Sequence, residues 1–101
     1  MKQLEPVSIT KKAQKEIEVI MKAKEIPVGY GLRIGLKNMG ASCGSPSYIL
    51  AFDTKKSTDL VYEVDKIPVY INKKEVLHVT GLKLDHVTEG DVSGFSFIEE
   101  N

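Results

Sequence analysis

Two stretches in which apolar and polar residues alternate, separated by a loop of small residues, most constrain how this chain can fold. They are residues 31–38 and residues 47–52. A period of two is typical of a half-buried strand, because successive side chains point to opposite faces of a sheet. Both stretches are therefore predicted to be strands. Their alternating apolar side chains are Leu32, Ile34 and Leu36 in the first and Tyr48, Leu50 and Phe52 in the second.

The loop between these strands, residues 39–46, carries the only cysteine of the chain, Cys43. Its neighbours are small residues that cannot fill a core, and Gly and Pro interrupt regular structure. Free cysteines are often buried and inert, but these surroundings favour an accessible thiol at a loop tip. Gly40 and Gly44 either give the turn its backbone freedom or let a ligand approach the backbone closely, and both can hold at once.

Length and charge limit the classes of protein to which this chain can belong. A chain of 101 residues is expected to form one domain, residues 1–101, and a net charge of zero gives no support to nucleic-acid binding. Residues 1–52 hold eight Lys/Arg and four Asp/Glu, whereas residues 53–101 hold six and ten. Solvated faces explain this asymmetry most simply, and complementary surfaces for self-association are the alternative.

The cysteine count and the hydropathy pattern bear on redox chemistry and location. One cysteine excludes a disulfide within the chain and a metal site built from four of its own thiolates. The first ten residues contain no apolar run of the signal-peptide type, and no run reaches transmembrane length. We therefore expect a cytoplasmic, reducing location and no membrane partner.

The N-terminal third of the chain is predicted to form a short strand followed by the main helix. Residues 7–9 read as the strand, and Thr10 is a good N-cap for a helix over residues 11–24. Pro27, with glycines nearby, is expected to end the helix and turn the chain into the next strand. The helix has one apolar stripe, made by Ala13, Ile17, Ile20 and Met21.

The C-terminal half reads as four short strands and one short helix. Residues 53–59 are expected to be a polar loop. Pro68 is expected to place the start of its strand at a sheet edge, and Asn72 is expected to cap the helix, which Gly81 ends. The apolar contacts of this helix are expected to come from Val76, Leu77 and Val79. Together with the N-terminal elements, this predicts a mainly β (α+β) fold of two small packed sheets flanked by helices. The predicted elements are strands 60–64, 67–71, 82–87 and 94–98, turns 65–66 and 89–91, and helix 73–79.

The order and spacing of these elements resemble the A-type iron–sulfur carrier family, also called HesB-like or IscA-like. The resemblance covers nearly the whole chain and implies a compact HesB-like domain that takes part in iron–sulfur cluster assembly. It rests on Ile9-Thr10 with Ala13 and Ile17, Gly31-Leu32-Arg33-Ile34-Gly35, Cys43 followed by Tyr48-Ile49-Leu50-Ala51-Phe52, and Leu84-Asp85-His86-Val87 before Gly94-Phe95-Ser96-Phe97.

The family pattern also has a Cys-x-Cys pair in a C-terminal tail, which this sequence lacks. The resemblance therefore implies iron or a [2Fe–2S] cluster held through Cys43, flanked by Gly40 and Gly44, across a homodimer. Glutathione, a thiol of an assembly or recipient protein, or Glu99 or Glu100 would complete the ligands. The alternative is a member that no longer binds a cluster and serves as an interaction or regulatory module.

The two histidines could in principle be metal ligands or part of a catalytic pair with the cysteine. His86 lies on a predicted strand and reads as a hydrogen-bonded core residue, whereas His78 is expected to be partly exposed; neither is a favoured metal ligand. A Cys–His nucleophile pair would make the protein an enzyme, but nothing in the spacing brings either histidine beside Cys43. The sequence therefore predicts a binding protein without catalytic residues.

Overall fold

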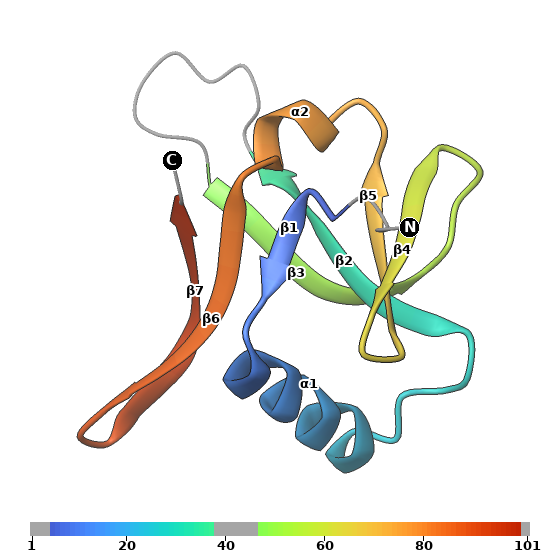
Figure 1. Ribbon diagram of the computed structural model, residues 1–101. Coiled ribbons are helices and arrows are strands. Elements are labelled where there is room, and N and C mark those ends of the chain that lie inside the picture. Colours follow the sequence, from blue (N-terminus) through green and yellow to red (C-terminus); the bar gives the residue numbers. More distant parts are fainter. Residues whose placement is uncertain (1–4, 38–46, 100–101) are drawn as a thin grey trace.

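The computed structural model describes residues 5–37 and 47–99, which form seven strands and two helices (Figure 1). The elements are β1 (Val7–Ile9), α1 (Lys11–Ala23), β2 (Tyr30–Lys37), β3 (Ser47–Thr54), β4 (Asp59–Val64), β5 (Ile67–Asn72), α2 (Val76–Val79), β6 (Leu82–Glu89) and β7 (Val92–Glu99).

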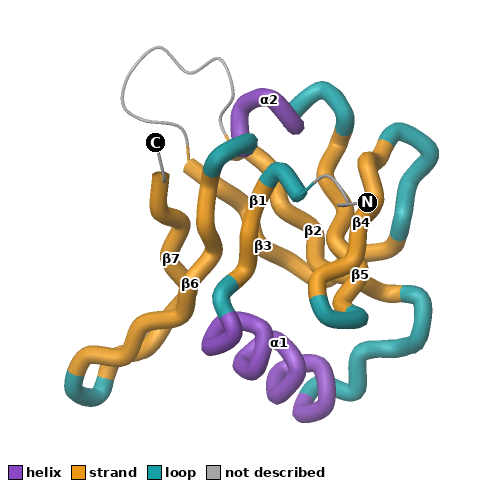
Figure 2. The backbone as a smooth tube through the Cα atoms, in the orientation of Figure 1, coloured by secondary structure: helices purple, strands orange, loops and turns teal. Residues whose placement is uncertain are grey.

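The strands form two sheets that share one apolar core. Three strands pair in the order β1-β6-β7 and four in the order β3-β2-β5-β4. Figure 2 shows α1 at one end of this pair of sheets and α2 at the other. Two small packed sheets with one main and one short helix are the predicted architecture, so that prediction is confirmed. The core residues with no more than 1% exposure are Val7, Ala13, Ile17, Leu32, Ile34, Tyr62, Val69, Ile71, Val79 and Leu84.

Helix α1 begins as predicted but ends by a different device. The Thr10 hydroxyl accepts a hydrogen bond from the Ala13 N–H at 3.1 Å, which satisfies one of the free donors of the first turn. At the other end the N–H groups of Glu25 and Ile26 donate to carbonyls of the last turn, the pattern of a Schellman motif. Glu25 takes the left-handed conformation (φ 51°) that glycine usually fills there. The helix therefore ends at Ala23 through this cap, before Pro27 is reached. Pro27 and Gly29 do make the expected turn into β2, because the Tyr30 N–H donates to the Pro27 carbonyl and Gly29 has a positive φ of 98°.

Strands β2 and β3 keep the alternation that predicted them. They pair antiparallel along their whole lengths, with Leu36 opposite Tyr48 and Leu32 opposite Phe52. The alternating side chains of β2 are buried, and those of β3 are partly buried against the same core. Ile49 is 37% exposed on the opposite face of β3. The β2–β3 ladder runs to the last residue of β2 and the first residue of β3. The two strand ends that flank segment 38–46 are therefore paired with each other.

Strands β4 and β5 form the predicted hairpin, with a correction at Pro68. Asp65 and Lys66 make the two-residue turn, and both have positive φ, the combination that suits the right-handed twist of a hairpin. β5 is an inner strand rather than an edge, because it also pairs in parallel with β2. That parallel ladder begins at Val69, so the missing N–H of Pro68 removes no bond from it.

Two further expectations in this half need correction. The polar loop is shorter than predicted, because β3 continues to Thr54 and β4 starts at Asp59, which is buried. The short helix covers only Val76–Val79, and the Asn72 side chain accepts from the N–H of Lys74 in the turn before it. Val79 is fully buried as expected, whereas Leu77 is 88% exposed.

Strands β6 and β7 form a long hairpin that extends beyond the rest of the molecule (Figure 1). Each strand is longer than predicted, so the turn shrinks to Gly90 and Asp91. Leu82, Leu84 and His86 lie on the buried face of β6, as the alternation predicted. β1 pairs in parallel with the first half of β6, which joins this sheet to α1.

Candidate functional site

The predicted site residues adjoin, along the sequence, strand ends that lie at the end of the molecule carrying α2. β2 ends there, β3 starts there and β7 ends there (Figure 1). Cys43, Gly40 and Gly44 belong to segment 38–46, and this segment and Glu100 are outside the described residues. Glu99 is the last residue of β7 and is exposed. The described residues therefore show the strand ends next to the predicted site residues, namely the end of β2, the start of β3 and the end of β7.

An aromatic contact joins the two sheets at this end. The rings of Tyr48 in β3 and Phe97 in β7 lie 5.2 Å apart, tilted by 46°, a favourable aromatic arrangement. Tyr48 pairs with Leu36 in β2, and Phe97 pairs with Leu84 in β6. The start of β3, the end of β2 and the end of β7 are consequently fixed with respect to one another.

A carboxylate from the residue preceding α2 also holds the end of β2. Glu75 Oε1 accepts a hydrogen bond from the Leu36 N–H at 3.3 Å. A Cβ placed on Gly35 would lie 2.7 Å from this oxygen, so a larger residue there would displace the carboxylate from its present position. Sequence reasoning missed Glu75, because a lone glutamate in a polar turn gives no signal that it packs on a strand 39 positions away.

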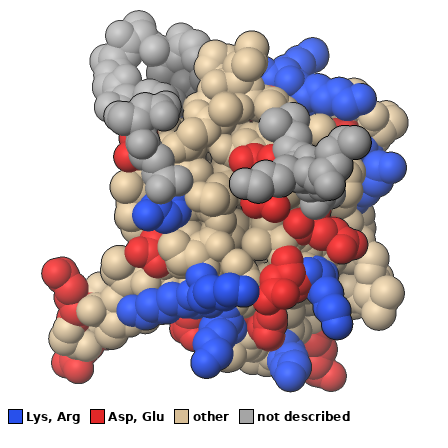
Figure 3. Space-filling view, viewed as in Figure 1, with Lys and Arg blue, Asp and Glu red and all other residues tan. Residues whose placement is uncertain are grey.

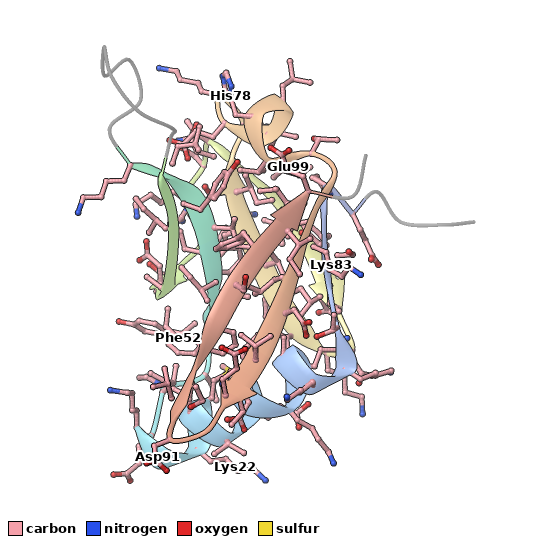
Figure 4. All side chains as sticks on the ribbon, turned by 90° about the vertical axis from the view of Figure 1, so that its left-hand side faces the viewer. Lys22, Phe52, His78, Lys83, Asp91 and Glu99 are labelled. Atoms are coloured by element: carbon pink, nitrogen blue, oxygen red, sulfur yellow. The ribbon has the colours of Figure 1, made fainter. Side chains whose placement is uncertain are left out.

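The two histidines lie in different surroundings. His78 is exposed on α2, at the same end of the molecule as Glu99 (Figure 4). His86 is buried, with Nε2 3.5 Å from a carboxylate oxygen of Glu16 and its ring edge-on to Phe95 at 5.0 Å. The exposure of His78 and the burial of His86 agree with the sequence predictions, but His86 Nδ1 is buried without a hydrogen-bond partner among the described residues, so the expected hydrogen bonding of this histidine is not confirmed. Among residues 5–37 and 47–99, no cluster of three His, Cys, Asp or Glu side chains could hold a metal ion.

The strongest electrostatic cluster, which sequence reasoning also missed, lies on the four-stranded sheet. Arg33 forms two hydrogen bonds with the carboxylate of Asp59, at 2.6 and 2.7 Å, and one with Asp53 at 2.8 Å. The hydrogen bond from Arg33 holds the pKa of Asp59 below its usual value. The pKa of Asp53 is about 2, mainly because Lys56 donates to it. The Arg33 guanidinium joins β2 to Asp53 of β3 and to Asp59 of β4, so we interpret this cluster as a structural tie.

Two wider surface features complete the description. An apolar groove of about 200 Å³ lies between α1, the β2–β3 pair and β7, and Phe52 and Phe95 are among its lining residues. Figure 3 shows basic side chains gathered along the α1 side and acidic side chains at the tip of the β6–β7 hairpin. Within the part of the chain that the structure describes, no helix is long and apolar enough to cross a membrane.

A comparison with protein-family models identifies the family. The model described as "Iron-sulphur cluster biosynthesis" matches residues 6–101, nearly the whole chain. The chain belongs to this family. The resemblance inferred from the sequence is therefore confirmed.

Individual relatives of the iron-sulphur cluster biosynthesis family agree with this assignment. "Iron-sulfur cluster assembly 1 homolog, mitochondrial" from Dictyostelium discoideum is 36% identical over 96 residues, covering 93% of this chain and 68% of the relative. "Iron-binding protein IscA" from Yersinia enterocolitica is 38% identical over 74 residues, covering 72% of this chain and 67% of the relative. Relatives named for iron–sulfur cluster assembly and for iron binding are thus similar to most of this chain.

Solved structures share the fold of this family member. The crystal structure of Escherichia coli SufA has a TM-score of 0.71 at 20% identity, covering 98% of this chain and 97% of SufA, and it shows the fold alone. The crystal structure titled "IscA with the [2Fe-2S] cluster" also has a TM-score of 0.71, at 25% identity, covering 94% of this chain and 83% of that one. The fold class predicted from sequence is confirmed by both.

Proposed function

We propose that this chain carries iron or a [2Fe–2S] cluster as cargo during iron–sulfur cluster assembly, and binds it through Cys43. The observation that supports this most is the family match over residues 6–101, together with a relative named as iron-binding. A similar structure whose title includes a [2Fe–2S] cluster supports the choice of cargo. Residues 1–101 would act as one HesB-like domain, as a binding protein rather than an enzyme.

The number of thiol ligands in one chain explains why the proposed cluster site needs a second molecule. Residues 1–101 contain one thiol, whereas iron–sulfur clusters are usually held by four thiolates. A homodimer would bring two Cys43 thiolates together. Glutathione, a cysteine of an assembly or recipient protein, or the carboxylates of Glu99 and Glu100 would complete the ligands. Gly40 and Gly44 would allow the backbone to approach the cargo closely.

The frame around segment 38–46 suits such a role. Tyr48 and Phe97 hold the two sheets together where the segment starts and ends, and Glu99 is exposed at the same end. The cargo would then lie at an exposed end of the molecule, where a partner protein can reach it. A cytoplasmic location stays a prediction for this chain. One of its relatives is named as mitochondrial.

Anaerobic reconstitution with iron and sulfide tests this proposal. We expect the wild-type protein, with glutathione present, to take up iron and to show visible thiolate-to-iron charge-transfer absorption, because thiolates are the usual cluster ligands. The Cys43→Ser variant should show neither. Equal absorption in both proteins would contradict a role for Cys43. Two equally colourless proteins would instead favour the interaction-module alternative.

The homodimer needs a measurement of its own. We expect sedimentation of the reconstituted protein to give a dimer with one cluster for two chains. The Glu99→Ala variant tests whether this exposed carboxylate is a ligand, and exposed Glu63 on β4 offers a matched control. Reconstituted protein that sediments as a monomer with a full cluster would contradict cargo shared between two chains.

A further inference from the structure

We propose that the exposed face of α1 binds the tip of the β6–β7 hairpin of a second copy of this chain, so that two copies associate through two identical contacts. Both surfaces lie at the end of the molecule opposite α2 (Figure 2). The contact involves neither Cys43 nor iron, and it therefore goes beyond the proposed function. The basic face consists of Lys12, Lys15, Val19 and Lys22. The acidic tip consists of Val87, Glu89, Asp91 and Val92.

The basic face is one stripe along α1. Its four residues lie three or four positions apart, a spacing that places side chains on the same side of a helix. All four are exposed, and Val19, between the lysines, keeps 58% of its surface. Of the lysines of α1, only Lys11 has an ion-pair partner in residues 5–37 and 47–99, namely Asp65 at 3.8 Å. The stripe therefore offers positive charge around an exposed apolar side chain.

The acidic tip has the opposite composition. Residues 84–101 contain no Lys or Arg, and within the described part of the chain neither Glu89 nor Asp91 has an ion-pair partner. Glu89 pairs with Val92 across the turn and Val87 lies two positions before Glu89, so these three side chains share one face of the hairpin. Val87 is 46% and Val92 is 74% exposed. The tip thus matches the basic face in both charge and apolar character.

The tip is also the part of the molecule with the least support of its own. β1 pairs with β6 only from Leu82 to Leu84, so the hairpin continues beyond that point as two strands. All residues from 87 to 93 are exposed, and the hairpin extends beyond the rest of the molecule (Figure 1). Because an isolated two-stranded hairpin is only marginally stable in water, a partner surface would stabilise the tip.

The distribution of charge favours a second copy as this partner. Residues 1–52 carry a net charge of +4, from eight Lys/Arg against four Asp/Glu, and residues 53–101 carry −4, from six against ten. Each copy therefore supplies both sides of the contact. Figure 3 shows the basic side chains of α1 and the acidic tip on one face of the molecule. A two-fold axis between them places each tip opposite the other copy's basic face, which gives a closed dimer rather than an open chain.

The first measurement is sedimentation velocity of the iron-free protein with a reductant. We expect a dimer that forms with rising concentration at low salt, and no larger species. The dimer should weaken between about 0.01 and 0.15 M ionic strength, because the Debye length falls from about 30 to about 8 Å. A protein that stays monomeric at low salt, or a dimer that salt does not weaken, overturns the proposal.

Two double variants with reversed charge test the contact itself. Lys15→Glu with Lys22→Glu makes the basic face acidic, and Glu89→Lys with Asp91→Lys makes the tip basic. Each variant alone should dissociate at least about tenfold more readily than wild type, because like charges then oppose each other. An equal mixture of the two should dimerise again, since both contacts of the mixed pair join opposite charges. A mixture that stays monomeric overturns the proposal.

A matched control separates this contact from general attraction between oppositely charged proteins. Lys55→Glu with Lys74→Glu gives the same net charge as the α1 variant, but both lysines are exposed outside the two surfaces. We expect this control to dimerise alone as wild type does. Mixed with the reversed-tip variant it should not form the mixed dimer, because its intact basic face meets a basic tip. Equal mixed dimerisation by the control and the α1 variant overturns the proposal.

The apolar part of the contact needs variants of its own. Val92→Ala should weaken the dimer several-fold, whereas Val61→Ala, at a position 39% exposed on β4, should leave it unchanged. Equal effects of the two changes contradict a contact at the tip. Every substituted residue is exposed, so far-UV circular dichroism should show all variants folded. Because no iron is present, loss of this contact leaves the proposed function open to its own test, reconstitution at about 0.15 M ionic strength, where the contact is screened.

Discussion

The Arg33–Asp59 pair offers the most quantitative test of how the four-stranded sheet is held together. Asp59 has no exposed side-chain surface and Arg33 is 16% exposed, so the pair is almost completely removed from water. The Asp59 carboxylate also accepts from the N–H of Lys56 at 2.7 Å, which orders the turn before β4. Replacing Asp59 by Asn keeps the volume but removes the charge and turns one acceptor into a donor that faces the guanidinium.

The expected loss follows from what remains after the change. Removing one partner of a buried ion pair costs about 3–5 kcal/mol, because the other charge stays buried without compensation. Arg33 keeps its hydrogen bond to Asp53 at 2.8 Å, so we expect the lower end of that range. A loss of about 3 kcal/mol should lower the Tm of a chain this size by roughly 12–24 °C.

Urea unfolding followed by far-UV circular dichroism measures the loss, since the chain has no tryptophan to report on unfolding. The control is Asp65→Asn, whose partner Lys11 lies 3.8 Å away and 86% exposed. Such surface pairs contribute about 0–1 kcal/mol. A loss at Asp59 no larger than at Asp65 would refute the assignment of Arg33–Asp59 as a structural tie.

The pH dependence provides a second readout with a definite sign. Arg33 holds the pKa of Asp59 below 3.8, its usual value, in the folded protein. The unfolded chain therefore takes up this proton first as the pH falls, and the stabilisation present at neutral pH is lost in acid. The Asn variant has no such proton, so its difference from wild type should shrink below about pH 4. A difference that stays constant down to about pH 3 would contradict this assignment.

Three further substitutions should change the free energy of unfolding. Tyr62→Phe should cost about 1–3 kcal/mol, because the buried hydroxyl donates to and accepts from the backbone of β1, whereas Tyr30→Phe at an exposed site should cost almost nothing. Glu25→Gly should stabilise the folded protein by about 0.5–1 kcal/mol, because the strain of a left-handed backbone at a residue with a side chain costs more than the added entropy of the unfolded chain. A loss of stability in this variant would contradict the Schellman assignment. Val79→Ala should cost about 2 kcal/mol and Leu77→Ala close to zero, since only Val79 is buried, and equal costs would show that α2 is packed differently.

The alternation of side chains was enough to predict most of the fold. Leu32, Ile34 and Leu36 are buried as the period of two predicted, and Thr10 caps α1 as its hydroxyl predicted. These features follow from local rules, because the period of a strand and the free N–H groups of a first helical turn depend only on neighbouring residues. The resemblance to a family of iron–sulfur proteins rested on the same ordered pattern, and the family match confirmed it.

Several of the errors fall where packing or a distant residue decides the local structure. Pro68 predicted an edge, but β5 is an inner strand, because it pairs with β2 as well as with β4. Pro68 is tolerated there because the parallel ladder with β2 starts one residue later. Leu77 was expected in the core, but the short helix α2 has only one buried face, which Val79 fills. Asp59 was assigned to a loop, and only its pairing with Arg33, 26 positions away, accounts for a buried carboxylate.

The sequence by itself therefore determined the strands and the main helix, because these depend on patterns that neighbouring residues carry. The order and spacing of the elements along the chain led to the family, and the resemblance to that family led to Cys43 as the candidate ligand. Only the tertiary structure decided which polar side chains meet: Glu75 with the end of β2, and Asp59 with Arg33. The physical reason is that a hydrogen bond or ion pair between distant segments depends on sheet order and register. Sheet order and register, in turn, are set by the packing of the whole core rather than by the residues that make the contact.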